Sequence, residues 1–345
     1  MANRNQKGIH FLLSSASKDL SVIELAMKSD DECRDMFAKI RWSDTDGTPT
    51  CPHCGTVDNY WFLPSTKRYK CKSCKKSYSI TTNTIFADRK MSFKQYLVAI
   101  FLFANKAKGS SMVELARTMK VNYKTIFLLA HKIRASIIDT QDEEQFDGIC
   151  EIDAVHTNMY IRPKNNINDR IDRRKAEKPN KRAVVVTRLR ADVNSGMFGA
   201  IKTKTDITIG ETAKDMEYIA LKNVKAGSQI HTDEADAFKP LHKTFDRKVV
   251  NHSWEYSSQE GYNNNQAESF NARFRRMVLG QHHHISTLYL SNYAAEVAYR
   301  EDTRRMTNGS IFKDLLSRCL MTPPHNEWRG YHQGNKRVAE RLIAA

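Results

Sequence analysis

Four cysteines in two pairs carry the clearest chemistry in the sequence. Cys51 and Cys54 are separated by two residues, Cys71 and Cys74 likewise, and sixteen residues separate the pairs. This spacing is typical of a zinc ribbon, in which four thiolates bind one tetrahedral Zn²⁺ ion. Two disulfides or unrelated buried thiols are the alternative, but the surrounding lysines favour the thiolate form that metal binding requires. We therefore predict one structural Zn²⁺ on these four cysteines, with His53 at the surface.

Three carboxylates further along the chain suggest a second metal site. Asp153 lies in an apolar strand-like run, Asp233 directly follows another, and Glu268 lies one turn into a helical segment. Carboxylates suit Mg²⁺ or Mn²⁺, and two such ions roughly 3.5–4 Å apart assist phosphoryl transfer. Three unpaired acids would also repel one another without a cation. We predict Asp153, Asp233 and Glu268 as catalytic residues and metal ligands, with Asn265 as the alternative third ligand.

The elements that must position these acids alternate between strands and helices. The predicted strands cover 149–155, 183–189, 197–202, 228–232 and 248–251, and the predicted helices cover 210–222 and 264–278. This order is that of an RNase H-like core, in which the first strand is central and the fourth lies beside it. The acids of those two strands would then meet at adjacent strand ends, with the last helix supplying the third.

The region before this core reads as helical on either side of the ribbon. Residues 18–40 predict a short helical pair, and Ser92 caps an apolar helix through Asn105. A second helix would end at Met119, and a turn leads to another that opens with Asn122, Tyr123 and Lys124. This is a helix-turn-helix pattern, and beside a zinc ribbon it predicts DNA contacts by those last three residues.

The predicted fold class is therefore α+β and multidomain: a zinc ribbon and a helical helix-turn-helix region followed by an RNase H-like mixed α/β core. The predicted divisions are a helical N-terminal region (1–47), the ribbon (48–90), the helix-turn-helix region (91–138), the catalytic core (148–305, with a basic loop at 162–190) and a C-terminal tail (306–345). The tail shows no interpretable pattern.

Charge points to a polyanionic partner. The 345 residues carry 55 Lys and Arg against 39 Asp and Glu, a formal net charge of +16. Eleven basic residues against three acidic ones fall between Arg162 and Arg190. There is no apolar run near 18 residues and no signal-peptide core, and the remaining cysteines are scattered. These features predict a soluble intracellular protein that meets nucleic acid.

Several motifs together resemble ISXO-type insertion-sequence transposases. The resemblance extends from about Thr48 to Arg300 and departs from the family at the residues after Asp153, which are Ala-Val-His-Thr in place of Glu-Thr-Tyr-Ile. The motifs that carry it are Tyr69–Phe86, Lys108–Ala116, Glu151-Ile-Asp153, His231-Thr-Asp233, Asn265-Gln-Ala-Glu268, Arg275 and Gly280–Ser286.

The resemblance implies metal-dependent cleavage and joining of DNA strands. The ribbon and helix-turn-helix would bind the terminal inverted repeats of double-stranded DNA, while the basic loop, Arg273, Arg275 and Arg276 would grip flanking or target DNA. It also implies two Mg²⁺ or Mn²⁺ ions, a homodimer or higher oligomer on DNA, and a cytoplasmic, nucleoid-associated location, or a nuclear one in a eukaryotic host. The alternatives are a DNA-binding regulator, an RNase H-like nuclease without strand transfer, and a domesticated copy.

Overall fold

The computed structural model describes residues 11–158, 164–170, 180–250 and 261–343. They form two compact units. One is built from the described residues of Met1–Gln141 with Thr303–Lys336, and the other from those of Asp142–Asp302 with the end of the chain. Of the described helices, none combines the length and apolar character needed to span a bilayer.

The second unit is built on a five-stranded mixed sheet with the order β6-β5-β4-β7-β8. Strand β5 runs antiparallel to both β6 and β4, whereas β7 is parallel to β4 and β8 is parallel to β7. The strands are β4 (Cys150–Asn158), β5 (Lys181–Arg190), β6 (Ala200–Thr208), β7 (Gln229–Thr232) and β8 (Asp246–Val249). The predicted strand order is confirmed, with the first strand central and the fourth beside it.

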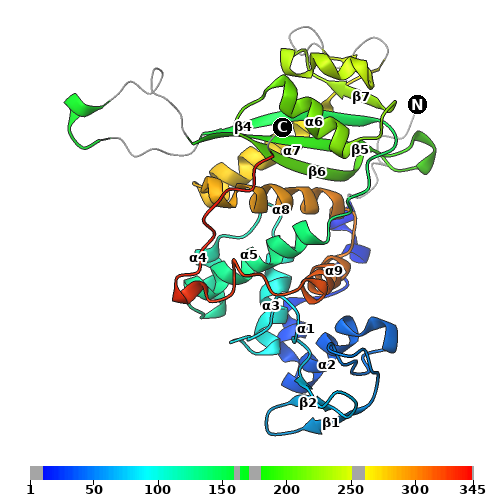
Figure 1. The fold of residues 1–345 in the computed structure, drawn as a ribbon, viewed down its shortest axis with the longest axis vertical. Coiled ribbons are helices and arrows are strands. Elements are labelled where there is room, and N and C mark those ends of the chain that lie inside the picture. The colour runs from blue at the N-terminus through cyan, green and yellow to red at the C-terminus, as the bar shows by residue number, and fades with distance from the viewer. Residues whose placement is uncertain (1–10, 159–163, 171–179, 251–260, 344–345) are drawn as a thin grey trace. The chain divides into compact units, whose positions relative to one another are not determined.

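Helices cover both faces of this sheet (Figure 1). The buried run Val184-Val185-Val186 of β5 sends alternate side chains to opposite faces, as strand geometry requires. Val184 and Val186 pack with Phe270 of α7, whereas Val185 packs with Met216 of α6. The helices are α6 (Ala213–Asn223), α7 (Asn265–Met277) and α8 (Leu290–Thr303). The unit therefore has three layers with an apolar core on each side of the sheet.

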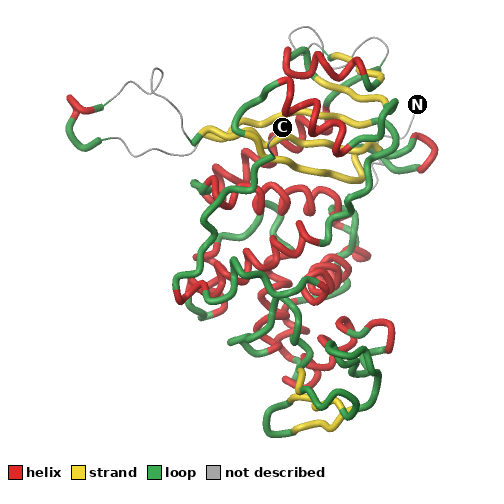
Figure 2. Tube along the Cα trace, viewed as in Figure 1, coloured by secondary structure: helices red, strands yellow, loops and turns green. Residues whose placement is uncertain are grey.

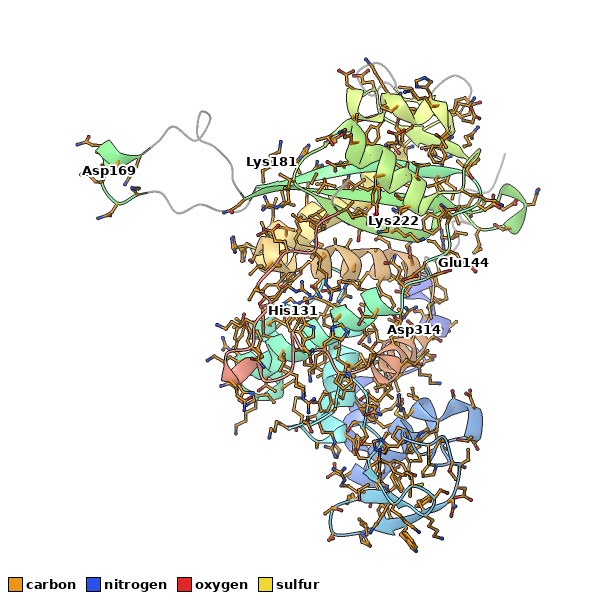
Figure 3. The ribbon with its side chains drawn as sticks, viewed as in Figure 1. His131, Glu144, Asp169, Lys181, Lys222 and Asp314 are labelled. Atoms are coloured by element: carbon orange, nitrogen blue, oxygen red, sulfur yellow. The ribbon has the colours of Figure 1, made fainter. Side chains whose placement is uncertain are left out.

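The third strand lies further along the chain than the sequence indicated. The predicted range was 197–202, but β6 spans Ala200–Thr208. The sequence did not indicate a strand here because the segment is rich in polar residues. In the folded protein, residues from other elements form the ion pairs and hydrogen bonds that these polar side chains need. Asp206 is largely buried and pairs with Lys222 of α6 at 2.8 Å (Figure 3). The other predicted elements of this unit agree with the structure to within a few residues.

The first unit combines a small antiparallel sheet with helices, as Figure 2 shows by colour. Its strands are β1 (Tyr60–Leu63), β2 (Arg68–Cys71) and β3 (Ser77–Tyr78), and its helices are α1 (Val22–Met27), α2 (Asp30–Arg41), α3 (Phe93–Ala104), α4 (Met112–Met119), α5 (Tyr123–Asp139) and α9 (Asn308–Met321). Ser92 and Ser111 cap α3 and α4, and Asn122 caps α5. Because side-chain oxygens accept from the otherwise unpaired first N–H groups, these caps fix where the helices begin.

Helix α9 is an element for which the sequence reading gave no assignment. Thr307 caps it by accepting from the Ser310 N–H at 3.1 Å, and Phe312, Leu315 and Leu316 are buried. The chain then returns to the second unit. There the Ile343 N–H donates to the Ile207 carbonyl of edge strand β6 at 2.8 Å. The tail is thus divided between the two units.

Candidate catalytic and metal sites

The first two predicted acids lie where β7 ends, but only Asp233 is at a strand end, because Asp153 lies within β4, which continues to Asn158. Strands β4 and β7 are parallel and pair Glu151 with His231. Asp153 and Asp233 each lie two residues beyond that pair, so their backbones lie at the same level along the two strands. Asp233 is held in a turn, where its Oδ1 accepts from the Ala235 N–H at 3.0 Å. The parallel register therefore brings together two acids that are eighty residues apart in the sequence.

The third acid is positioned by a clamp between Glu151 and the start of α7. The Glu151 side chain is fully buried, and its Oε2 accepts from the N–H groups of Gln266 and Ala267 at 2.7 and 2.9 Å. A carboxylate at this point satisfies unpaired helix donors and complements the positive end of the helix dipole. Because Glu268 is the next residue of α7, the clamp also fixes the position of Glu268 relative to β4.

A partly buried arginine completes the clamp. Arg190 of β5 donates through Nε to the Glu151 Oε1 at 2.6 Å and through Nη2 to the Asn263 carbonyl at 2.9 Å. His231 of β7 also contacts that carbonyl, through Nδ1 at 2.9 Å. The residues that precede α7 are thus tied to three strands. Burial raises the pKa of Glu151, while Arg190 and the helix N–H groups oppose that rise.

Asn271 is a site residue that the sequence reading missed. Its Nδ2 donates to the Asp153 Oδ2 at 2.8 Å, and it lines a cavity of about 570 Å³ with Asp153, Glu268, Asn265 and Arg275. Asn271 lies three residues after Glu268, which puts both side chains on one face of α7. That spacing was a readable signal. The cavity gathers two of the three predicted ligands, the alternative ligand and one predicted DNA contact.

The electrostatics of Asp153 reflect burial among other acids. Burial raises the pKa of Asp153 to about 7, and the negative charges of Asp233, Glu211 and Glu268 add to the rise, although the Ala154 N–H opposes it. Both of the other predicted acids thus act on Asp153. A carboxylate that is costly to ionise alone becomes favourable to ionise beside a cation, because opposite charge stabilises the ionised form. Hard oxygen donors in this setting fit Mg²⁺ or Mn²⁺.

Glu211 is a further acid at this site that the sequence did not reveal. It precedes α6, and its Oε2 lies 3.1 Å from the His156 Nε2. Burial raises the pKa of Glu211, His156 lowers it, and the charge of Asp233 raises it again. No local pattern marks a loop glutamate as part of a site. It joins the others because the β6–α6 connection ends near the same sheet edge.

The acids are near one another but not at ligand distance. Within the described ranges, the four cysteines are the one group of three or more candidate ligands whose atoms all lie within 4.8 Å of each other.

The four cysteines, by contrast, have sulfur atoms close enough together to bind one metal ion. Cys51 and Cys74 have sulfurs 3.7 Å apart, and those of Cys54 and Cys71 are 3.6 Å apart. Tetrahedral Zn–S bonds of about 2.3 Å imply S–S separations of about 3.8 Å. Hydrogen bonding by Thr56 lowers the pKa of Cys54 to about 6, which favours the thiolate. The cluster fits one structural zinc ion.

The predicted DNA contacts of the first unit are exposed. Asn122, Tyr123 and Lys124 lie at the start of α5, after a turn in which Lys120 has a left-handed backbone, and Tyr123 is 47% exposed. Exposure of the first turn of the second helix is what a helix-turn-helix needs for contacts in the major groove.

The basic residues of the second unit divide into two groups. Arg275 and Arg276 are exposed near the end of α7, whereas Arg188 is buried and pairs with Glu301 at 3.4 Å. Arg182 forms a two-bond ion pair with Glu340. Of the predicted basic loop, the structure describes 164–170 and 180–190, where Lys181 is exposed (Figure 3). The rest lies outside the described residues. Some arginines of this range therefore hold the fold together.

Comparison with known proteins agrees with this architecture. Residues 145–302 match the ISXO2-like transposase domain, and residues 28–77 match the transposase zinc-ribbon domain. A protein in transposable element ISH50 of Halobacterium salinarum is 21% identical over 308 residues, which cover 85% of this chain and 97% of that protein.

The matched DDE domain and the mixed sheet that carries the acids define a class: nucleotidyl-transfer proteins that act on DNA. Within that class, the two matched domains and their order are those of insertion-sequence transposases. The motifs of the sequence agree with both matches: the chain carries an ISXO2-like transposase domain and a transposase zinc-ribbon domain. Both domains imply that it binds DNA.

Proposed function

We propose that this protein binds the terminal inverted repeats of an insertion sequence and catalyses metal-dependent DNA strand cleavage and strand transfer. Asp153, Asp233 and Glu268 are the proposed catalytic residues. The observation that carries the proposal is the cavity shared by Asp153, Glu268 and Arg275, at a sheet edge where Asp233 adds its charge.

The carboxylates of Asp153, Asp233 and Glu268 would hold two divalent ions, which when bound supply a Lewis acid for the attacking and leaving oxygens. Asn271 donates to the Asp153 Oδ2, and the Ala154 N–H donates to Oδ1 at 2.7 Å, so both carboxylate oxygens are held in place, and each keeps a further lone pair for a ligand. Arg275 lies two helical turns after Glu268 and lines the same cavity, where its guanidinium suits a DNA phosphate. Asn265 lines it too and stays the alternative third ligand.

The DNA-binding part of the proposal rests on the first unit. Phosphate contacts by basic residues would supply affinity, and Asn122, Tyr123 and Lys124 would reach base edges and fix the register. Cleavage of two element ends in concert requires at least two active sites, so we propose a dimer or higher oligomer on DNA.

The test is a nicking and strand-transfer assay on DNA that carries the inverted repeats flanking the gene. Asp153→Asn should abolish Mg²⁺-dependent nicking, because the amide cannot supply the charge that the metal site needs. Asp236→Asn is the matched control, since that acid is 88% exposed and pairs with Lys239. It should nick as the wild type does.

Three outcomes would contradict the proposal. No Mg²⁺-dependent nicking by the wild type would favour a DNA-binding regulator, and intact nicking by Asp153→Asn would remove the catalytic assignment. Nicking without joined products would instead indicate a nuclease of the same fold.

A further inference from the structure

The first unit contains a large cavity, of which the proposed function uses only the residues at the start of α5. Its volume is about 960 Å³, and it lies between the segment 85–91, the first half of α5 and the segment 324–336. Tyr123 and Lys124, the predicted DNA contacts at the start of α5, form part of its wall. It is therefore continuous with the helix-turn-helix surface.

The wall of this cavity is strongly basic. Among the described residues that line it, Asp88 is the one acid, and its carboxylate already contacts Arg329 at 3.4 Å. The cations are Arg89, Lys90, Lys124, Lys132, Arg329 and Lys336. Such an excess around one concavity favours a polyanion, because a concave basic surface concentrates the positive potential.

Aromatic rings form a row across the same wall. The Tyr123 ring centroid lies 6.0 Å from that of Phe127, which lies 6.1 Å from that of Tyr331. Tyr123 is 47% exposed, and Tyr331 is half-buried. The Lys336 ammonium lies 6.0 Å from the Tyr331 ring centroid. The cavity thus presents ring faces together with cations.

The segment that supplies Tyr331 is held firmly. Trp328 is buried and stacks on His131 of α5 at 5.1 Å, and His131 lies among the helices of this unit (Figure 3). Gly330 and Gly334 have positive φ angles and close a tight loop around the short helix Tyr331–Gln333. A Cβ at Gly330 would meet the Asn335 side chain at 2.9 Å. The loop therefore fixes Tyr331 beside Phe127.

We propose that this cavity binds an unpaired stretch of DNA, with bases stacked on Tyr331 and Tyr123 and phosphates on the surrounding lysines and arginines. Cationic grooves with aromatic platforms bind single strands because every base offers a π-face. In duplex DNA the base faces are stacked on one another, and only base edges and phosphates are accessible. Aromatic rings inside a cavity cannot stack on those groups. The proposal rests on the proposed function only in taking DNA as the polyanion.

The experiment measures fluorescence anisotropy with two probes, single-stranded oligothymidine of about 16 nucleotides and a duplex of equal length. Tyr331→Leu keeps apolar volume but loses the ring, and should weaken oligothymidine binding by roughly 10- to 100-fold. Duplex binding should change by less than about 2-fold. Tyr331→Phe should bind both probes as the wild type does, which excludes a hydroxyl contact.

Tyr218→Leu is the control, because Tyr218 is an exposed tyrosine on α6 of the second unit and does not line the cavity. It should leave both affinities unchanged. Oligothymidine binding by Tyr331→Leu at wild-type strength would overturn the proposal, and so would an equal loss with both probes. Failure of the proposed function would appear separately, as nicking that Asp153→Asn does not reduce.

Discussion

Asp153 is partly buried and lies near three acidic side chains, so its ionisation opposes folding when no cation is bound. Its folded-state pKa of about 7 lies above the value of 3.8 for a free side chain. The folded protein thus holds this proton over a range where the unfolded chain has released it. Linkage then makes the free energy of unfolding fall as pH rises from about 4 to about 7.

Asp153→Asn should consequently stabilise the metal-free protein above pH 7. The expected gain is on the order of 2–4 kcal/mol at pH 8 and close to zero at pH 4, where wild-type Asp153 is protonated. Urea unfolding with a chelator present, at both pH values, measures the difference. Mg²⁺ should stabilise the wild type and not the variant. A difference of equal size at pH 4 and pH 8 would show that Asp153 does not titrate in this range.

Glu151 also affects the site at the residue scale, by positioning helix α7 and Glu268. Glu151→Ala leaves Arg190 without its carboxylate and α7 without an acceptor for its first N–H groups. We expect a loss of about 3–5 kcal/mol in the free energy of unfolding, as is usual when one partner of a buried ion pair is removed. Glu151→Gln keeps one acceptor oxygen and should lose clearly less.

Chemical denaturation measures both Glu151 variants. Because the clamp sets the position of Glu268, Glu151→Gln should also need more Mg²⁺ for half-maximal nicking. A variant that folds stably and nicks at the wild-type Mg²⁺ concentration would contradict the positioning role.

At the scale of elements, helix α7 and the zinc ribbon are stabilised by different interactions. Helix α7 is amphipathic, and its buried face, with Phe270 and Phe274, packs on β5 through an extensive apolar core. The ribbon strands have few residues, and β3 spans only Ser77–Tyr78. Apart from the stacked pair Tyr69–Tyr78 and its neighbours, the ribbon relies on its metal.

Zinc removal should therefore unfold the ribbon and leave the second unit folded. Cys54→Ser, which removes an exposed ligand, should bind less than one zinc ion per chain and lose at least about 10-fold in affinity for the element end. Cys319→Ser is the control, because Cys319 is buried in α9, outside the metal cluster. Metal analysis and anisotropy measure these effects. Full end binding by a zinc-free Cys54→Ser protein would exclude a role for the ribbon in recognition.

At the scale of the whole molecule, net charge governs the encounter with DNA. The chain carries +16, and exposed basic residues occur in both units, among them Lys124 and Arg275. Part of the basic content is committed to internal ion pairs, such as Arg188–Glu301 and Arg190–Glu151. The charge available to phosphates is therefore smaller than the count of basic residues implies.

DNA binding should still depend steeply on salt. If roughly 6–10 phosphates are neutralised, affinity should fall by about 10³–10⁵ between 50 and 200 mM salt, because counterions are released on binding. A salt titration of duplex affinity measures the slope. Lys124→Ala should reduce that slope by about one unit, whereas Lys67→Ala should not, because Lys67 pairs with Asp31. A flat salt response would contradict the electrostatic basis of binding.

The sequence by itself determined the features that depend on short-range spacing. Two cysteine pairs, each with two intervening residues, predicted the zinc site. The cap at Ser92 and the helix predicted to open at Asn122 gave helix starts that the structure confirms. The order of strands and helices predicted the sheet, because few topologies suit that order. Hydrophobic periodicity and helix capping depend on residues close together in the sequence, so they can be recognised without knowing the tertiary structure.

Only the tertiary structure decided the contacts between distant residues. Glu151 clamps a helix more than a hundred residues away, Asn271 holds Asp153, and Glu211 joins the acids from a loop with no motif. Helix α9 and Tyr331 come from a tail whose sequence alone showed no pattern. These roles depend on which surfaces pack together, and packing is set by the whole core rather than by neighbours in sequence.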